Sequence, residues 1–149
     1  MTPYEQRVRV AAVVRNDRAE ILCVRHFNRG EPFWTLPGGE PQATETPETA
    51  ILREVAEETG WNVRLGGIIF VCALHADRWE RPKIELVFSA VPLSHDSRVS
   101  RAADVVESHF FAFSEVPPSF RPREALALLR VTTTVPYVNL AVEGLPDGP

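Results

Sequence analysis

The sequence predicts a single α+β domain in which a mixed β-sheet is accompanied by a few helices. Short apolar runs of strand type recur along residues 7–113, and residues 47–59 combine a helical apolar period with helix-ending residues on both sides. The chain has 149 residues, of which 44% are hydrophobic and 24% charged, and this composition suits one core rather than two. We therefore expect one domain over residues 1–149, with a core over about residues 7–130 and a tail over about residues 131–149.

Six apolar runs, rich in β-branched and aromatic residues, predict the strands. In chain order they cover residues 7–15, 21–25, 34–36, 63–74, 83–91 and 105–113. The turn-forming pair Asn16-Asp17 separates the first two runs, so we expect these to form a hairpin. Gly66-Gly67 inside the fourth run predicts a bulge or bend.

The segments between these runs are polar or rich in Pro and Gly, which predicts loops and turns. The expected loops cover residues 27–33, 75–82, 92–104 and 114–121. A short helix is expected over residues 122–130, and the polar tail that follows is expected to be mobile.

The main helix is predicted over residues 47–59. Thr46 is a favourable N-cap, Pro47 a favourable first helical residue, and Gly60 a favourable C-terminal stop. At about 100° per residue, one arc of this helix is apolar and is expected to face the core. This stripe consists of Ile51, Leu52, Val55, Ala56 and Thr59.

Three glutamates, Glu54, Glu57 and Glu58, fall on a second arc of the same helix. Their spacing of i, i+3 and i+4 makes the side chains neighbours. Such a cluster is either a solvated acidic face or a cation site. Because Arg53 is the only basic residue on this turn, we expect the carboxylate repulsion to stay unrelieved along the helix. A divalent cation would relieve it, and hard oxygen ligands suit Mg²⁺ or Mn²⁺.

The segment before the helix supports the second interpretation. Gly38 and Gly39 lack a Cβ, so their backbone can approach the helix closely, where carbonyls ligate metal or amides face phosphate. Glu45 lies just before the cap, where the helix dipole favours a carboxylate, although simple capping would explain it equally well.

Taken together, these residues resemble the Nudix box. The segment from Gly39 to Trp61, GEPQATETPETAILREVAEETGW, has every charged and glycine position of that pattern, and WTLPGG precedes it as in many members. ESHFFAFSEVP at residues 107–117 is similar to a later strand of the family. The departures are Trp61, at a position that is usually aliphatic, and Gln42 and Thr44, where many relatives have Glu and Gly.

This resemblance implies a Nudix-type α/β/α sandwich and Mg²⁺- or Mn²⁺-dependent hydrolysis of a nucleoside diphosphate linked to another group. The metal ligands that it implies are Glu54, Glu57, Glu58 and the Gly38 carbonyl. Arg53 would pair with neighbouring carboxylates and hold them in place for catalysis. The residues that it implies for shaping the loop and the helix ends are Gly39, Glu45 and Gly60.

A carboxylate must also accept a proton from the attacking water. We favour Glu57 or Glu58 for this role, while Asp104 and Glu107, before the last strand, are alternatives outside the box. The plainer interpretation of Glu107 is a surface charge on an edge strand.

Arginines are expected to contact substrate phosphates, and aromatic rings to stack on its base. The candidates are Arg25, Arg29, Arg78, Phe27, Phe33, Trp34 and Trp79, with Glu107 as an auxiliary. For each arginine an exposed side chain without a ligand is the plainer interpretation, and Phe33 and Trp34 suit the core or its rim equally well.

Composition narrows the class of partner. The net charge of −4 disfavours a general nucleic-acid binder, and no apolar run approaches the ~18 residues of a membrane span. Cys23 and Cys72 lie in apolar runs and are expected to be buried free thiols in a reducing cytoplasm. We therefore expect a cytoplasmic protein whose partner is a small nucleotide, with a homodimer left open.

Several functions remain open within this resemblance. A (d)NTP or a broad range of nucleotides is the favoured substrate, and ADP-ribose, a nucleotide sugar or a dinucleoside polyphosphate are alternatives. A non-hydrolytic nucleotide-binding module is a second class, although such modules often lose box glutamates that this chain retains. An isomerase on the same fold ranks last, because it needs a reactive cysteine.

Overall fold

A computed structural model describes residues 7–27, 31–74, 83–98 and 105–121, together with residues 126 and 129. Its elements are β1 (Arg7–Val14), β2 (Ile21–His26), β3 (Phe33–Thr35), β4 (Gly38–Gly39), α1 (Pro47–Thr59), β5 (Trp61–Leu74), β6 (Lys83–His95), β7 (Val105–Phe111) and the 3₁₀ turn η1 (Phe113–Glu115). The predicted loop over residues 75–82 and the tail lie outside the described residues, as does most of the predicted helix over residues 122–130.

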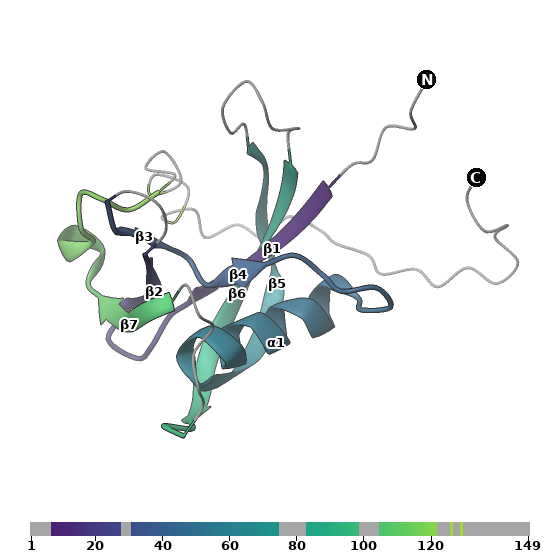
Figure 1. Cartoon of the computed structure of the whole chain (residues 1–149). Coiled ribbons are helices and arrows are strands. Elements are labelled where there is room, and N and C mark those ends of the chain that lie inside the picture. The colour runs from purple at the N-terminus through teal and green to yellow at the C-terminus, as the bar shows by residue number, and fades with distance from the viewer. Residues whose placement is uncertain are drawn as a thin grey trace, which may run out of the picture.

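The strands form two sheets, with the order β4-β1-β6-β5 in one and β3-β2-β7 in the other. β1 and β6 run parallel, while the other paired strands run antiparallel, so the sheet arrangement is mixed as predicted. Figure 1 shows α1 lying across the larger sheet, with β2, β3 and β7 to one side. The described residues therefore have the α+β architecture expected from the sequence.

The predicted hairpin between the first two strands is wrong. One isolated bridge joins Arg15, the residue after β1, to Ile21, and the two strands otherwise belong to different sheets. β6 pairs with one edge of β1 along the whole length of β1. β4 pairs with the other edge of β1, at Val10 and Ala11. Because both edges of β1 are occupied, β2 must pair with β3 and β7 instead.

β6 extends to His95, beyond the predicted strand end at residue 91. Pro92 made the loop prediction reasonable, because proline cannot donate to a β-ladder. Pairing with β1 ends at Ala90, however, and the register with β5 shifts at Val63, opposite Pro92. Pro92 therefore lies at a bulge, where the ladder does not require an N–H donor from this residue.

α1 has the predicted limits and the predicted ends. The Thr46 hydroxyl accepts a hydrogen bond from the Thr49 amide at 3.2 Å, and Gly60 ends the helix with a φ of 77°. Ile51, Val55 and Thr59 are buried, as expected. Leu52 is 41% exposed, which corrects its assignment to the core stripe, because Glu58 completes the buried side instead.

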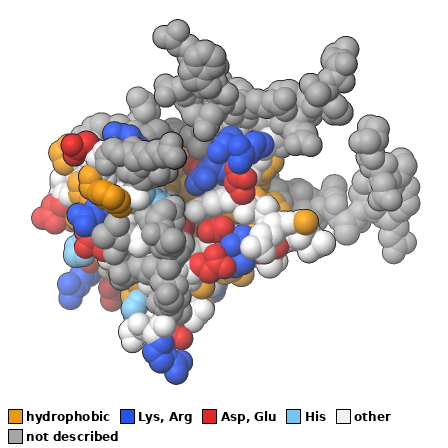
Figure 2. Space-filling model, in the orientation of Figure 1, with side chains coloured by type: hydrophobic (Ala, Val, Ile, Leu, Met, Phe, Trp, Pro, Cys, Tyr) orange, Lys and Arg blue, Asp and Glu red, His pale blue; other side chains and the backbone are white. Residues whose placement is uncertain are grey.

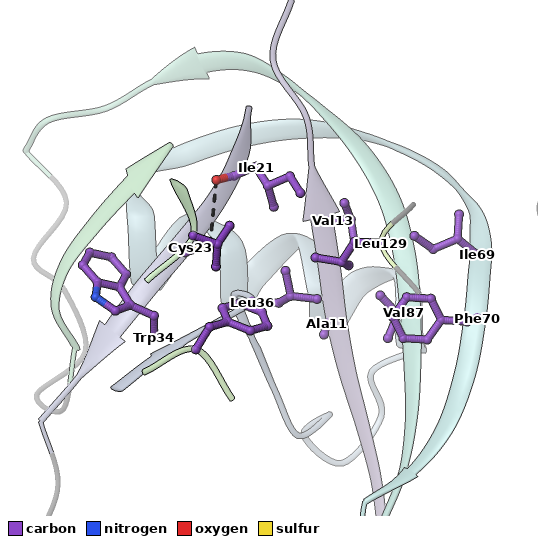
Figure 3. Packing of buried hydrophobic residues seen from close by; sticks show 12 residues of the cluster. Ala11, Val13, Ile21, Cys23, Trp34, Leu36, Ile69, Phe70, Val87 and Leu129 are labelled. Carbon is purple, nitrogen blue, oxygen red and sulfur yellow. Dashed lines mark hydrogen bonds between the residues drawn. The ribbon is translucent and has the colours of Figure 1, made fainter. Parts of the chain in front are cut away.

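Two hydrophobic clusters cover the two faces of β1. Ala11 and Val13 pack with residues of β2, β5 and β6, as Figure 3 shows. The alternate residues Val10, Ala12 and Val14 pack with α1 on the opposite face. All five side chains are at most 2% exposed, so β1 is a rigid central support for the segments that it contacts.

Among the described residues, no helix has both the length and the apolar character needed to cross a membrane.

The loop before α1 contains a strained residue, Thr44, with a φ of 79°. The Glu45 amide donates to the Gln42 carbonyl at 3.0 Å, which makes Thr44 the third residue of a turn of the kind that favours glycine. A Thr44→Gly variant should gain about 0.5–1 kcal/mol of unfolding free energy, because relief of left-handed strain exceeds the added chain entropy. Urea denaturation should show a higher midpoint at an unchanged slope.

The matched variant Thr46→Ala removes the N-cap of the same loop–helix junction and should lose about 1 kcal/mol. A lower midpoint for Thr44→Gly would contradict the strain argument.

Candidate active site

The backbone of β4 lies directly against a carboxylate of α1. A Cβ on Gly39 would lie 2.5 Å from both the Cδ and an oxygen of Glu54, so only glycine leaves room for this carboxylate. Glu54 is half-buried, and this burial raises its pKa, with the charge of Glu57 adding to the shift and Arg53 opposing it. A further positive charge beside Glu54 would therefore be favourable.

Arg53 joins three carboxylates around the start of this site. Its Nη1 donates to Glu54 at 2.9 Å and to Glu57 at 3.1 Å. Its Nε and Nη2 donate to the two oxygens of Glu45 at 2.7 and 2.9 Å. The expectation that carboxylate repulsion stays unrelieved along the helix is therefore wrong, because one guanidinium bridges neighbouring glutamates.

Glu45 connects this cluster to the loop before α1. Its Oε1 also accepts the Gln42 amide at 2.7 Å. The hydrogen bonds from Arg53 and then from Gln42 lower the pKa of Glu45, so this carboxylate is ionised at neutral pH. Figure 2 shows acidic side chains gathered on the face that carries α1, with basic side chains beside them.

Glu58 differs from its two neighbours because it is buried, with 3% of its surface exposed. One of its oxygens accepts the Gly38 amide at 2.7 Å, and the other lies 3.8 Å from the His26 Nε2. His26 in turn contacts the Thr35 hydroxyl at 3.1 Å. Glu58 thus holds the Gly38–Gly39 segment, whereas Glu57 is exposed and is held by Arg53 at the surface.

The donor chemistry of this site suits a divalent cation. Within the described part of the chain, no three His, Cys, Asp or Glu side chains are already gathered around one point. The observation that favours a cation is the packing of Glu54 against Gly39. Here a backbone segment lies beside a carboxylate, and burial has raised the pKa of that carboxylate. Hard oxygen donors of this kind favour Mg²⁺ or Mn²⁺.

The candidate substrate contacts lie mainly on β2, β3 and β7. Arg25 Nε lies 3.1 Å from a Glu107 oxygen, on directly paired residues of β2 and β7. Phe33 is half-buried, with the His26 ring 5.6 Å and the Arg121 guanidinium 5.1 Å from its ring centre. His26 links Phe33 and Arg121 to the buried Glu58, whereas Arg25, the residue before it on β2, lies on the opposite face of the strand, with its guanidinium 6.0 Å from the Trp34 ring.

Two of the aromatic residues expected to stack on a base, Trp34 and Phe27, differ in how far they are exposed. Trp34 is only 8% exposed and packs edge-to-face on Phe111, an arrangement that argues against stacking on a base. Phe27 is 61% exposed. The candidates that lie outside the described residues are Arg29, Arg78, Trp79 and Asp104.

A charged row on β1 and β6 was not predicted. Arg9 donates to the largely buried Glu85 at 3.2 Å, on paired residues of the two strands. Glu40, inside the box segment, pairs with Arg7 at 2.5 Å and with Lys83 at 3.4 Å. The sequence contained one sign of this row, because charged residues interrupt the apolar runs that form β1 and β6. Only the pairing of the two strands brings those charges together.

The two cysteines differ in burial. Cys23 is fully buried, as predicted, whereas Cys72 is half-buried with its Sγ 4.0 Å from a Glu85 oxygen. Burial raises the pKa of Cys23 to about 12. Burial and then the Glu85 charge raise the pKa of Cys72 to about 11. Neither thiol is activated as a nucleophile.

Both thiols should therefore resist alkylation in the folded protein. At about pH 8, iodoacetamide should modify native Cys23 and Cys72 at least ~10-fold more slowly than the urea-unfolded chain, because the thiolate is the reactive form. Mass spectrometry of the alkylated peptides measures each site. Rapid labelling of one thiol that added nucleotide suppresses would contradict this expectation and favour an isomerase.

Comparisons with known proteins agree with this geometry. The family described as NUDIX domain matches residues 5–131. A "MutT-like protein" of Streptomyces ambofaciens is 34% identical over 105 residues, which cover 70% of this chain and 64% of the relative. A "Putative 8-oxo-dGTP diphosphatase" of Bacillus subtilis is 37% identical over 73 residues, which cover 49% of this chain and 43% of the relative. The chain thus spans less than two thirds of either relative.

The solved structures support the same fold. A NUDIX hydrolase from Nitrosomonas europaea superimposes with a TM-score of 0.76 at 22% identity, covering 84% of this chain and 86% of that one.

Proposed function

The chain belongs to the NUDIX domain family, and on that premise we propose that it is a metal-dependent hydrolase of the diphosphate linkage in a nucleoside diphosphate derivative. One observation carries this proposal. The box carboxylates Glu54 and Glu57 share a single guanidinium of Arg53, beside a glycine backbone that Glu54 contacts directly. A solvated acidic face would require neither the glycine approach nor the buried Glu58.

The chemistry requires both charge neutralisation and a positioned base. Bound at Glu54, Glu57 and Glu58, with the Gly38 carbonyl as a further ligand, Mg²⁺ or Mn²⁺ would offset the diphosphate charge and acidify a water. Arg53 keeps Glu54 and Glu57 oriented, and Glu45 anchors Arg53 to the loop. Glu58 fixes the backbone of Gly38 through its amide.

Glu57 is the strongest candidate for the general base. It is exposed, so its carboxylate can reach a water and can release the proton to solvent. Glu58 is buried and already accepts the Gly38 amide, and Glu107 is paired with Arg25. Glu57 also pairs with Arg53, but it does so at the surface, through one of its two oxygens, which leaves the other oxygen for a water.

We infer that the substrate is a (d)NTP or a range of nucleotides, with an oxidised purine triphosphate as one member. The similarity to a protein named as an 8-oxo-dGTP diphosphatase supports this class. Phe33 and Arg121 offer a ring and a guanidinium group that the His26 ring connects to the buried Glu58. ADP-ribose and nucleotide sugars are the second candidates, because they carry the same diphosphate linkage.

A hydrolysis screen tests this proposal. The full chain would be incubated with Mg²⁺ or Mn²⁺ and (d)NTPs, 8-oxo-dGTP, ADP-ribose, UDP-glucose or diadenosine polyphosphates, with products identified by mass. A short 5′-triphosphorylated RNA would test the expectation that no nucleic-acid polymer is a substrate. We expect turnover of a nucleotide that stops on chelation of the metal. Nucleotide binding with no turnover of any compound would contradict the proposal and favour a non-hydrolytic binding module.

A further inference from the structure

An open groove lies between the turn that joins β1 to β2 and the adjoining ends of β5 and β6, with a volume of about 680 Å³. Trp61 of β5 and Phe110 of β7 line it and pair edge-to-face, with ring centroids 5.6 Å apart. Both rings are only partly buried. The volume lies within the range of small-molecule sites, and the exposed ring surface suits a planar group.

The rim of the groove carries free positive charge. Arg18 and Arg64 are exposed, and no described residue forms an ion pair with either guanidinium. Guanidinium groups bind phosphate oxygens through two parallel hydrogen bonds. The third arginine of the lining, Arg15, is occupied by the Leu129 carbonyl. Two cationic side chains are therefore available to a ligand.

The same lining offers an acceptor beside these donors. Asp17 is exposed on the turn next to Arg18, and no ion pair occupies its carboxylate among the described residues. A carboxylate accepts hydrogen bonds from hydroxyl groups. The groove thus combines aromatic surface, two guanidinium groups and a hydroxyl acceptor, which together match one class of molecule.

We propose that this groove is a second ligand site, which binds a nucleoside phosphate. The base lies against Trp61 and Phe110, the phosphate pairs with Arg18 and Arg64, and the sugar hydroxyls donate to Asp17.

This site is separate from the box carboxylates. None of Arg53, Glu54, Glu57 and Glu58 lines the groove. Binding here therefore needs no metal, and hydrolysis at the box needs neither arginine of the rim.

The test is calorimetric titration of the full chain with AMP, GMP, CMP and UMP in EDTA, with inorganic phosphate as a further probe. At least one mononucleotide should bind, and more tightly than phosphate. Arg64→Ala and Arg18→Ala should each raise its Kd about 10-fold or more, because each removes a charge-assisted contact. Trp61→Leu, or Phe110→Leu if the first variant folds poorly, should raise the Kd about 10-fold through lost stacking.

Arg98→Ala is the matched control, since this side chain is 89% exposed, pairs with Asp96 and does not line the groove. Its Kd should equal that of the wild type. Failure of every mononucleotide to bind with a Kd below about 1 mM, or a Kd that the groove variants leave unchanged, would overturn the proposal. Arg64→Ala should hydrolyse nucleotides at the wild-type rate. Absence of hydrolysis would therefore contradict the proposed function alone, and absence of nucleotide binding in EDTA would contradict the groove site alone.

Discussion

Replacement of Glu57 by glutamine should lower kcat for metal-dependent nucleotide hydrolysis at least ~100-fold, the range that general acid–base groups contribute. Glutamine retains the size of the side chain but removes both the proton acceptor and a charged metal ligand. The Glu57 side chain is 51% exposed and has Arg53 as its contact, so the fold should be unaffected. Steady-state kinetics with the best substrate of the screen, together with the thermal midpoint, measure both effects.

Glu48→Gln is the matched control, because it makes the same change in the first turn of the same helix. Its kcat should stay close to that of the wild type. Wild-type turnover by Glu57→Gln, at an unchanged metal dependence, would contradict the role of Glu57 and move the search for the base to Glu58 or Glu107.

Gly38→Ala should have the largest effect on stability, with a loss of about 3 kcal/mol, at the upper end for an overpacked core. A Cβ here would lie 2.2 Å from the Val10 carbonyl oxygen and 2.9 Å from the Ala11 Cα, both of them backbone atoms of β1. β1 is buried on both faces and paired on both edges, so it cannot move aside. Urea denaturation should show the lower midpoint.

Gly39→Ala is the informative partner of this variant. The three atoms nearest to its Cβ would all belong to the Glu54 carboxylate, the closest at 2.5 Å, and a side-chain end can rotate away. We expect a stability loss of about 1 kcal/mol but a fall in kcat of at least ~10-fold, because a misplaced ligand is costly to catalysis. Equal stability losses for the two variants, or full activity in Gly39→Ala, would contradict this account.

The local features of α1 could be predicted from the sequence because their causes are local. The Thr46 cap, Pro47 and the glycine at position 60 act within one turn of the residues that they affect. Strand positions also followed from apolar runs, since a buried strand needs few distant partners to be recognised. The family resemblance rests on the same short-range spacing.

Strand partners were not predictable in this way. The turn at Asn16-Asp17 favoured a hairpin, yet β1 pairs in parallel with β6 from much later in the chain. Whether β6 can contain Pro92 likewise depends on where β1 ends and where the register with β5 shifts. A ladder is decided by which edges remain open after the whole sheet has formed, and no short segment contains that information.

The division of roles within the box shows the same limit. The sequence by itself determined the helix, its caps and the set of three glutamates. Only the tertiary structure decided that Glu58 is buried against Gly38, that Glu54 lies against Gly39 and that Glu57 stays exposed. Spacing along a helix defines which side chains are neighbours, whereas burial and hydrogen-bond partners depend on the strand that packs against them.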